Sequence, residues 1–212
     1  MTKVLVVGPV FIDSIYAGLP EMPKAGQEVY GTDHLITVGG FAINAIGFAR
    51  LGLSPMLVSA VGDDLFGTFL ENRLRSEGVA TEGLVKVAGA LTSHSTAMVF
   101  DGDRRFVSYA GAELTESELL AEWVKRMPNP FDEVKLMHIG LRDDSKLPQL
   151  LQEVRSHGVL ISLACGWPAV ERYRNSHAEL VEILRHTDLL FCNEIEALGI
   201  SGKSEIKDAL RF

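Results

Sequence analysis

The sequence predicts an α/β protein with three layers, in which helices cover both faces of a mostly parallel sheet and a small β lid stands off that sheet. Three observations support this class. Short apolar runs typical of buried strands alternate with segments typical of helices. A helix bounded by glycines follows the first strands, and a hairpin with an Asp-Gly turn interrupts the alternation. We expect the 212 residues to form a single domain, 1–212.

The core strands and helices are predicted from the composition of each segment and from the residues at which it begins or ends. The first strand, Lys3–Gly8, is short, rich in valine and ended by Gly-Pro. Further strands are expected at Pro55–Val61, Val134–Ile139, Val159–Ala164 and Leu189–Cys192. Helices are expected at about Leu65–Glu77, Thr115–Arg126, Lys146–His157 and Asn175–Arg185. Asp63 or Asp64 is suited to cap the helix at Leu65–Glu77. Thr115 and Glu118 have the spacing of a capping box at the start of the next helix.

The stretch Val38–Gly52 is expected to be a helix buried on every face, because nearly every position is apolar. Asn44 is the polar exception in its first turns. Gly39 and Gly40 would let a ligand approach the helix N-terminus, where free N–H groups point outward. Two interpretations stay open: these residues bind a hydroxyl-rich small molecule, or they are a tight turn and a core amide bonded to backbone.

Extended segments that interrupt the alternation of strands and helices are expected to form the lid. They are Phe11–Tyr16, a strand near Glu28–Val38, and the hairpin strands Ser95–Phe100 and Arg105–Tyr109 around Asp101-Gly102-Asp103. The lid segments therefore lie at about 14–38 and 94–111.

Composition excludes several classes of function. The net charge is −8 and no basic stripe is evident, so neither nucleic acid nor a membrane surface is an expected partner. No run approaches the roughly 20 apolar residues of a membrane span, and the N-terminal run is too short for a signal peptide. The expected location is cytoplasmic.

Cys165 and Cys192 follow apolar runs, which favours core thiols over a disulfide or a metal pair.

Ligands of such sheets bind beyond the carboxyl ends of the strands. Polar residues and glycines from many parts of the chain are expected at that edge. They are Asp13, Gly39–Asn44, Gly62-Asp63, Gly111, Leu141–Asp144, Cys165–Trp167 and Asn193–Glu196. Their convergence favours a functional site over a set of unrelated turns.

These residues resemble the ribokinase-like, pfkB-type family of carbohydrate kinases. The matching pieces occur in family order: Gly8 with Asp13, Gly39–Asn44, Val61–Gly67, the hairpin with Gly111-Ala112, and Asn193–Glu196. The resemblance implies a ribokinase-like, Rossmann-like fold and a kinase that transfers the γ-phosphoryl group of ATP to a hydroxyl of a sugar or sugar-like substrate. The alternative is a non-catalytic sugar-binding or regulatory protein of the same fold.

The resemblance covers only the N-terminal portion of the family's length. The family's Gly-Ala-Gly-Asp type motif, which supplies the catalytic base aspartate, is not found in the sequence. We therefore expect a C-terminally truncated domain, inactive or weakly active, with no catalytic residue assigned. Asp143 and Asp144 are candidate substitutes for the base, with solvated loop acids as the alternative interpretation.

The resemblance also implies roles for single residues. The substrate site would comprise Asp13, Gly39, Gly40, Asn44 and Gly111. Asn193 and Glu196 would serve the cofactors ATP and Mg²⁺, with Glu196 reaching the metal through water. The alternative for this pair is an ordinary capping box at a helix start. The β segments would cover the sugar, and in this family the lid often also forms a contact between two copies, so a homodimer through the lid is expected.

Two departures from the family pattern bear on the substrate. Phe11 and Phe41 stand where ribokinases proper carry Asn and Lys, so the pocket would be more apolar. A different sugar, a sugar acid or a nucleoside-like substrate stays open.

Overall fold

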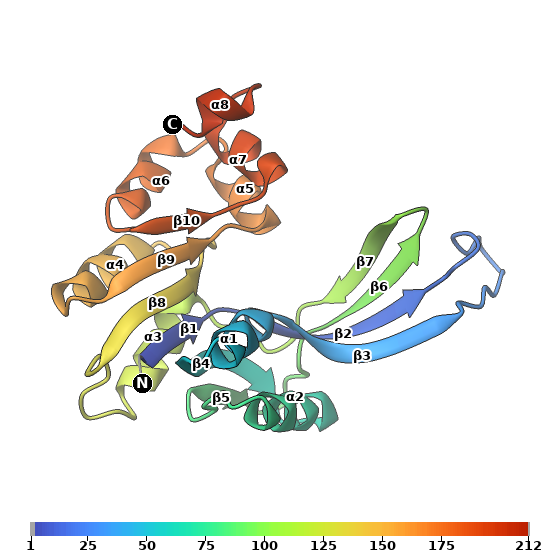
Figure 1. The fold of residues 1–212 in the computed structure, drawn as a ribbon, viewed down its shortest axis with the longest axis horizontal. Helices are drawn as coiled ribbons and strands as arrows, with labels where there is room; N and C mark the ends of the chain where they lie inside the picture. Colours follow the sequence, from blue (N-terminus) through green and yellow to red (C-terminus); the bar gives the residue numbers. More distant parts are fainter. Residues whose placement is uncertain (1–2, 212) are drawn as a thin grey trace.

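The computed structural model describes residues 3–211. Six strands form the main sheet in the order β10-β9-β8-β1-β4-β5, and every neighbouring pair is parallel (Figure 1). The strands are β1 (Lys3–Val7), β4 (Ser54–Gly62), β5 (Leu84–Val87), β8 (Val134–Gly140), β9 (Leu160–Ala164) and β10 (Leu189–Phe191). The predicted fold class is confirmed. β5 is not among the predicted strands, because its four residues, of which only Leu84 is buried, give too short an apolar pattern to detect.

Two apolar clusters cover the two faces of this sheet. Val4 and Val6 of β1 pack with α1 and α2, whereas the alternate residues Leu5 and Val7 pack with the helices of the other face. The helices of the first face are α1 (Phe41–Arg50) and α2 (Leu65–Ser76). Those of the second are α3 (Glu116–Val124), α4 (Leu147–Ser156), α5 (Trp167–Tyr173) and α6 (His177–Leu184). The chain continues through α7 (Glu194–Ser201) and α8 (Ile206–Ala209).

A second, four-stranded sheet extends away from the main sheet (Figure 1). Its order is β3-β2-β6-β7, with β2 (Val10–Ala17), β3 (Asp33–Gly40), β6 (His94–Phe100) and β7 (Asp103–Tyr109). The predicted hairpin is present as β6 and β7, joined by Asp101 (φ 52°) and Gly102 (φ 75°). Tight hairpin turns require such positive φ angles because they match the twist of the strands. The strand expected near Glu28 begins only at Asp33.

The helix α1 differs from the prediction in its burial. Ala42, Ala45 and Ile46 are buried, but Ile43 is 58% exposed and Asn44 is also exposed. The prediction of a helix buried on every face is therefore wrong. The reason is geometric: α1 packs its buried side against β4 and β1, and no described element covers the opposite side.

Capping residues explain where several of the helices begin. Asp64 caps α2 by accepting a hydrogen bond from the Gly67 N–H, and Thr115 and Glu118 form the predicted capping box of α3. α6 begins at His177, close to the start of the helix predicted at about Asn175–Arg185, whereas the separate helix α5 before it is not among the predicted helices. None of the helices in residues 3–211 has the length and apolar character needed to cross a lipid bilayer.

Candidate functional site

A cavity of about 290 Å³ lies at the carboxyl ends of β8 and β9, beside the start of β2 and α1. Its wall consists of Pro9, Phe11, Phe41, Glu113, Gly140, Leu141, Arg142, Ala164, Cys165, Gly166 and Pro168. The lining combines aromatic rings with one cation and one acid, from segments far apart in sequence. Ligand pockets typically have this mix and this position in parallel sheets.

Asp13 lies beside this cavity on β2. It shares a face of the strand with the cavity residue Phe11, since residues two apart point the same way. Its carboxylate is half-buried and accepts no hydrogen bond from residues 3–211. Burial raises the pKa of Asp13 above its ordinary value. A half-buried acid without a protein partner has its hydrogen-bonding capacity free for a ligand.

Position 39, next to the Asp13 carboxylate, requires a residue without a side chain. It lies on the neighbouring strand β3, opposite Phe11, and a Cβ at this position would overlap the Asp13 carboxylate. Only glycine therefore leaves room for the acid in this orientation.

A polar row crosses the second sheet at the level of Asp13. Thr37 and Ser95 are its register partners on β3 and β6, and Ser95 Oγ lies 2.8 Å from Ser108 Oγ on β7. Sequence reasoning missed these three residues. The alternation of polar and apolar residues along each strand could have indicated them, but the pairing of the strands was needed to align them with Asp13.

Gly40 and Asn44 lie at the start of α1. Gly40 is the N-cap with φ 61°, a conformation that favours glycine. Asn44 is exposed about one turn further along the helix and makes no hydrogen bond with residues 3–211. The core-amide alternative for Asn44 is therefore wrong, whereas its role in binding stays a prediction.

Gly111 lies where the hairpin returns to the main sheet. Its N–H donates to Ser93 Oγ at 3.0 Å, and a Cβ here would overlap the carbonyl oxygen of Leu91. The adjoining Thr92 is fixed by Asp64: Asp64 Oδ2 accepts from the Thr92 N–H at 2.9 Å, and Asp64 Oδ1 accepts from Thr92 Oγ1 at 2.6 Å. Gly111 thus belongs to the junction between the two sheets.

Glu116 is the functional candidate that sequence reasoning missed. It is the first residue of α3, is 0% exposed, and neither carboxylate oxygen has a hydrogen-bond partner in residues 3–211. Burial raises the pKa of Glu116 to about 7, while the positive charge of Arg142 acts in the opposite direction. In sequence it is one more acid in a capping box, and such acids are usually solvated.

The two loop aspartates proposed as substitute bases are both engaged. Asp143 is exposed and pairs with Arg172 at 2.6 Å. Asp144 is 6% exposed, and its oxygens accept hydrogen bonds from the Ser117 and Lys146 N–H groups. The solvated interpretation is thus wrong for Asp144, which instead ties the loop after β8 to the start of α3.

Asn193 and Glu196 form a reciprocal capping box at the start of α7. Asn193 Oδ1 accepts from the Glu196 N–H at 2.8 Å, and Glu196 Oε2 accepts from the Asn193 N–H at 2.9 Å. The capping alternative is therefore present. Glu196 Oε1 makes no hydrogen bond with the described residues, so the box leaves one carboxylate oxygen for another partner.

Cys165 lines the cavity, but its thiol is not suited to nucleophilic chemistry. Burial, and then the negative charge of Glu196, raise the pKa of Cys165 to about 12. Cys165 and Cys192 are both free thiols, and both are half-buried rather than fully buried in the core. Only the thiolate form of cysteine is a strong nucleophile, and the Cys165 thiol stays protonated near neutral pH.

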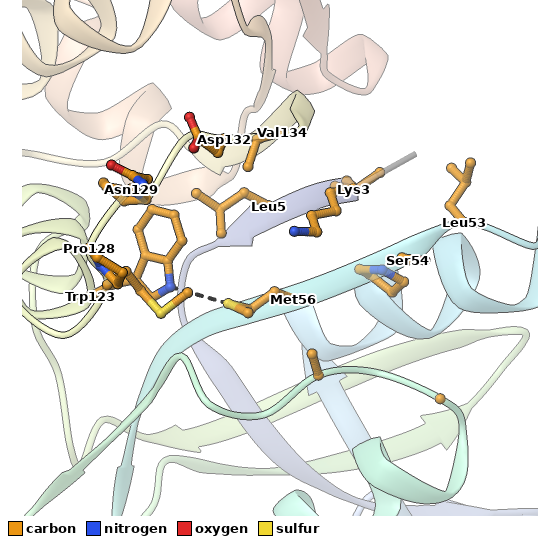
Figure 2. Close-up of a pocket in the computed structure, with 16 residues that line it drawn as sticks. Lys3, Leu5, Leu53, Ser54, Met56, Trp123, Pro128, Asn129, Asp132 and Val134 are labelled. Atoms are coloured by element: carbon orange, nitrogen blue, oxygen red, sulfur yellow. Dashed lines mark hydrogen bonds between the residues drawn. The ribbon is translucent and has the colours of Figure 1, made fainter. Parts of the chain in front are cut away.

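A second cavity, of about 480 Å³, lies at the opposite edge of the main sheet (Figure 2). It is formed by the first residues of β1, β4 and β8, with Trp123 donating its indole N–H to Met56 Sδ at 3.1 Å. Its polar residues, among them Lys3 and Asp132, lie around a mostly apolar wall. The amino edge of a parallel sheet is not the usual location of a ligand site, so the cavity beside Asp13 is the candidate.

Comparison with known proteins gives a consistent result. The sequence profile of the pfkB family carbohydrate kinases matches residues 1–212. Ribokinase of Bacillus subtilis (strain 168) is 33% identical over 217 residues, which cover 99% of this chain and 68% of that protein. Nucleoside kinase of Methanothermobacter thermautotrophicus is 31% identical over 174 residues, which cover 79% of this chain and 52% of that protein. The chain thus spans between about half and two thirds of the length of these relatives.

The fold has close counterparts among solved structures. Ribokinase of Arabidopsis thaliana, solved in complex with ribose and ATP, superposes with a TM-score of 0.75 at 21% identity. The match covers 99% of this chain and 67% of that structure. This likeness supports the three-layer fold described above.

Proposed function

The chain belongs to the pfkB family of carbohydrate kinases, and from this premise we propose that it binds a sugar or nucleoside and presents one of its hydroxyls to the γ-phosphoryl group of ATP. The observation that carries the proposal is Asp13, a half-buried carboxylate that lies beside the cavity and has no hydrogen-bond partner in residues 3–211. A carboxylate accepts hydrogen bonds from two hydroxyls at once, and neighbouring hydroxyls are the feature that sugars share. We place the protein in the cytoplasm.

The glycines and the second sheet complete the acceptor site in this proposal. Gly39 gives the carboxylate of Asp13 its space, and in this proposal Asn44 and the N–H groups near the start of α1 would reach the same ligand. Gly111 anchors the return of the hairpin. The four-stranded sheet then serves as a lid that covers the sugar and excludes water from the reaction.

Asn193 and Glu196 fit a nucleotide and its metal. Residues 3–211 contain no group of three or more His, Cys, Asp or Glu side chains that could hold a metal ion by themselves. Mg²⁺ commonly keeps several waters and uses few protein ligands, so the free Glu196 Oε1 is a suitable partner for its hydration shell. When bound, ATP supplies the phosphoryl group and Mg²⁺ lowers the cost of the charge that develops on it.

A second candidate function is polyol binding without phosphoryl transfer. The observation that favours it is that Asp143 and Asp144 are both engaged, so we assign no general base among the described residues. Release of ADP, coupled to NADH oxidation, separates the two functions on a panel of D-ribose, D-fructose, D-gluconate and adenosine. Turnover above the rate without acceptor supports the kinase. Binding without turnover supports the second candidate.

Replacing Asp13 with asparagine is expected to weaken binding of the preferred panel compound about 100-fold. The charged carboxylate would accept two hydroxyl hydrogen bonds, each stabilising by roughly 1.5–3 kcal/mol, and the amide keeps only one acceptor. Isothermal titration calorimetry measures the change. Asp33→Asn, on an exposed position of the same sheet, is the control and is expected to bind like the wild type. Equal affinity of Asp13→Asn and the wild type would exclude Asp13 from the site.

The lid is also proposed to join two copies of the chain. Leu35, Ile15, Ala97 and Phe106 form an apolar row across its four strands, on the face that carries Asp13. Leu35 is 56% exposed and Phe106 is 53% exposed, which is unfavourable unless a partner covers them.

We therefore expect the wild type to be a dimer and the double variant Leu35→Asp/Phe106→Asp to be a monomer. A dimer of this variant would bury two negative charges from each copy in the contact between the lids, without partners of opposite charge. Size-exclusion chromatography with light scattering measures the mass. Val107→Asp, 65% exposed on the opposite face, is the matched control and should remain dimeric. A wild type that is monomeric at 100 μM would rule out this contact.

A further inference from the structure

Glu116 has a chemical environment that its position at a helix start does not explain. Its carboxyl is fully buried, yet both oxygens lack a hydrogen-bond partner in residues 3–211. Leaving a polar group in this state costs stability, and buried polar groups in folded proteins nearly always have a partner. A buried carboxyl that the described residues leave unsatisfied is available to a group that a ligand brings.

The carboxyl of Glu116 lies directly behind the wall of the cavity beside Asp13. The ideal Cβ position of Gly140 is 2.8 Å from Glu116 Oε1 and 3.3 Å from Cζ of Phe41. Gly140 and Phe41 both line the cavity. Because residue 140 has no side chain, the Glu116 carboxyl and the edge of the Phe41 ring both lie against the space beside Gly140, a residue of the cavity wall.

We propose that Glu116 is a specificity-determining residue of the acceptor site, whose carboxyl hydrogen-bonds a hydroxyl of the bound sugar or nucleoside through the gap left by Gly140. This inference rests on the proposed function, since it assigns a further contact to the same substrate. Asp13 binds the substrate from the second sheet, and Glu116 binds it from the main sheet. Two acids on different elements then fix the orientation of the ring.

The protonation state of Glu116 sets the kind of hydrogen bond it makes. Burial raises its pKa to about 7, so the neutral carboxyl, which both donates and accepts, is populated below that pH. The charged groups that act on it are Arg142, which favours the ionised form, and Asp144 and Glu113, which oppose it. A neutral acid beside the Phe41 ring can donate to a sugar oxygen without bringing an unpaired charge into an apolar wall.

Three variants test the contact. Glu116→Leu removes both oxygens, Glu116→Gln keeps a donor and an acceptor without titration, and Gly140→Ala narrows the gap with a methyl group. The φ angle of Gly140 is not in the left-handed region, and the atom that its new Cβ meets first is the end of a flexible side chain, so the alanine variant should fold. Glu122→Gln, which replaces a partly exposed acid on the same helix that pairs with Lys125, is the matched control.

The full 212-residue chain is titrated with D-ribose, D-fructose, D-gluconate and adenosine at pH 6.5 by calorimetry. For the preferred compound, we expect Glu116→Leu and Gly140→Ala each to weaken binding about tenfold, as the loss of one buried hydrogen bond would. The double variant should be no worse than either single variant, because both remove the same contact. Glu116→Gln and Glu122→Gln should bind within about twofold of the wild type.

Thermal melting distinguishes this role from a structural one. A carboxyl kept for the fold would make Glu116→Leu less stable, whereas a carboxyl kept for the ligand leaves the leucine variant equally or more stable while it binds more weakly. Unchanged affinity of Glu116→Leu, in a protein whose Asp13→Asn variant has lost binding, overturns this inference and leaves the proposed function intact. A wild type that binds none of the four compounds overturns both.

Discussion

Replacing Asp64 with alanine is expected to lower the free energy of unfolding by about 3 kcal/mol, because a helix cap and a buried inter-loop contact are lost together. Asp64 caps α2 through the Gly67 N–H and also accepts from the N–H and the hydroxyl of Thr92. Thr92 Oγ1 in turn accepts a hydrogen bond from the Gly62 N–H at 3.0 Å. One carboxylate therefore connects the end of β4, the start of α2 and the segment leading into β6.

The pKa of Asp64 agrees with this assignment. Burial alone would raise it, but the hydrogen bonds from Thr92 and Gly67 leave the pKa below its ordinary value. A depressed pKa means that the ionised form stabilises the fold above the pKa of the unfolded chain, and that this contribution is lost as the pH falls. The difference between the wild type and Asp64→Ala should therefore shrink in strong acid.

Urea denaturation at pH 7 measures the Asp64 effect, and a chain of this size should also lose about 6–12 °C in melting temperature. Asp64→Asn retains the cap but turns an amide donor toward the Thr92 N–H, so an intermediate loss is expected. Asp63→Ala is the control, since Asp63 is exposed and makes no hydrogen bond with the described residues, and its effect should stay within about 0.5 kcal/mol. Equal losses for the two alanine variants would contradict the role given to Asp64.

The second large effect is a stabilisation. Glu116→Gln is expected to unfold with a free energy about 3 kcal/mol higher than that of the wild type at pH 8, since each pKa unit corresponds to roughly 1.4 kcal/mol. The folded chain holds the pKa of Glu116 near 7, whereas the ordinary value is 4.5. Between these values the folded state binds more protons than the unfolded state, so the stability of the wild type falls as the pH rises. Glutamine does not titrate and avoids this loss.

The pH profile is the measurement that checks the stabilisation. Urea denaturation of both proteins should give similar free energies near pH 4.5, a difference that grows up to about pH 7, and a plateau above it. Glu122→Gln, at a partly exposed position of α3, should show no gain at pH 8, because the hydrogen bond from Lys125 lowers the pKa of Glu122 rather than raising it. A glutamine variant that is less stable than the wild type at pH 8 would mean that the ionised carboxylate of Glu116 has a partner within the fold.

This result would also bear on the role of the site. An acid that costs stability at neutral pH persists in a folded protein only where something else uses it, and binding sites are where such groups concentrate. The stability and the binding experiments on Glu116 therefore support each other: a gain in stability for Glu116→Gln at pH 8 and a loss of affinity for Glu116→Leu at pH 6.5 are the expected pair of results.

Features that depend on a few neighbouring residues could be predicted from the sequence. The capping boxes of α3 and α7 need residues three apart, the hairpin turn needs Asp101-Gly102, and the strands of the main sheet need short apolar runs. Asp13 and Gly39 could be placed at the same edge of the sheet because the order of strands and helices fixes where each strand ends. These predictions rest on local geometry and on topology, both of which the order of residues encodes.

Burial could not be predicted in the same way. Asn44 was expected to be buried and is exposed, Asp144 was expected to be solvated and is buried, and Glu116 was given no role. Whether a side chain meets water depends on what packs across from it. Those neighbours lie dozens of residues away, as the contacts between Asp64 and Thr92 and between Asp144 and Ser117 show.

By itself, the sequence determined a parallel α/β sheet with a hairpin beside it and the set of residues at its carboxyl edge, because local propensity and apolar periodicity suffice for both. The tertiary structure alone decided that Gly140, at the end of strand β8, leaves its space to a glutamate from helix α3, and that Asp64 connects two loops. The physical reason is that the free energy of a charge or a hydrogen bond is set by the surroundings that folding creates around it.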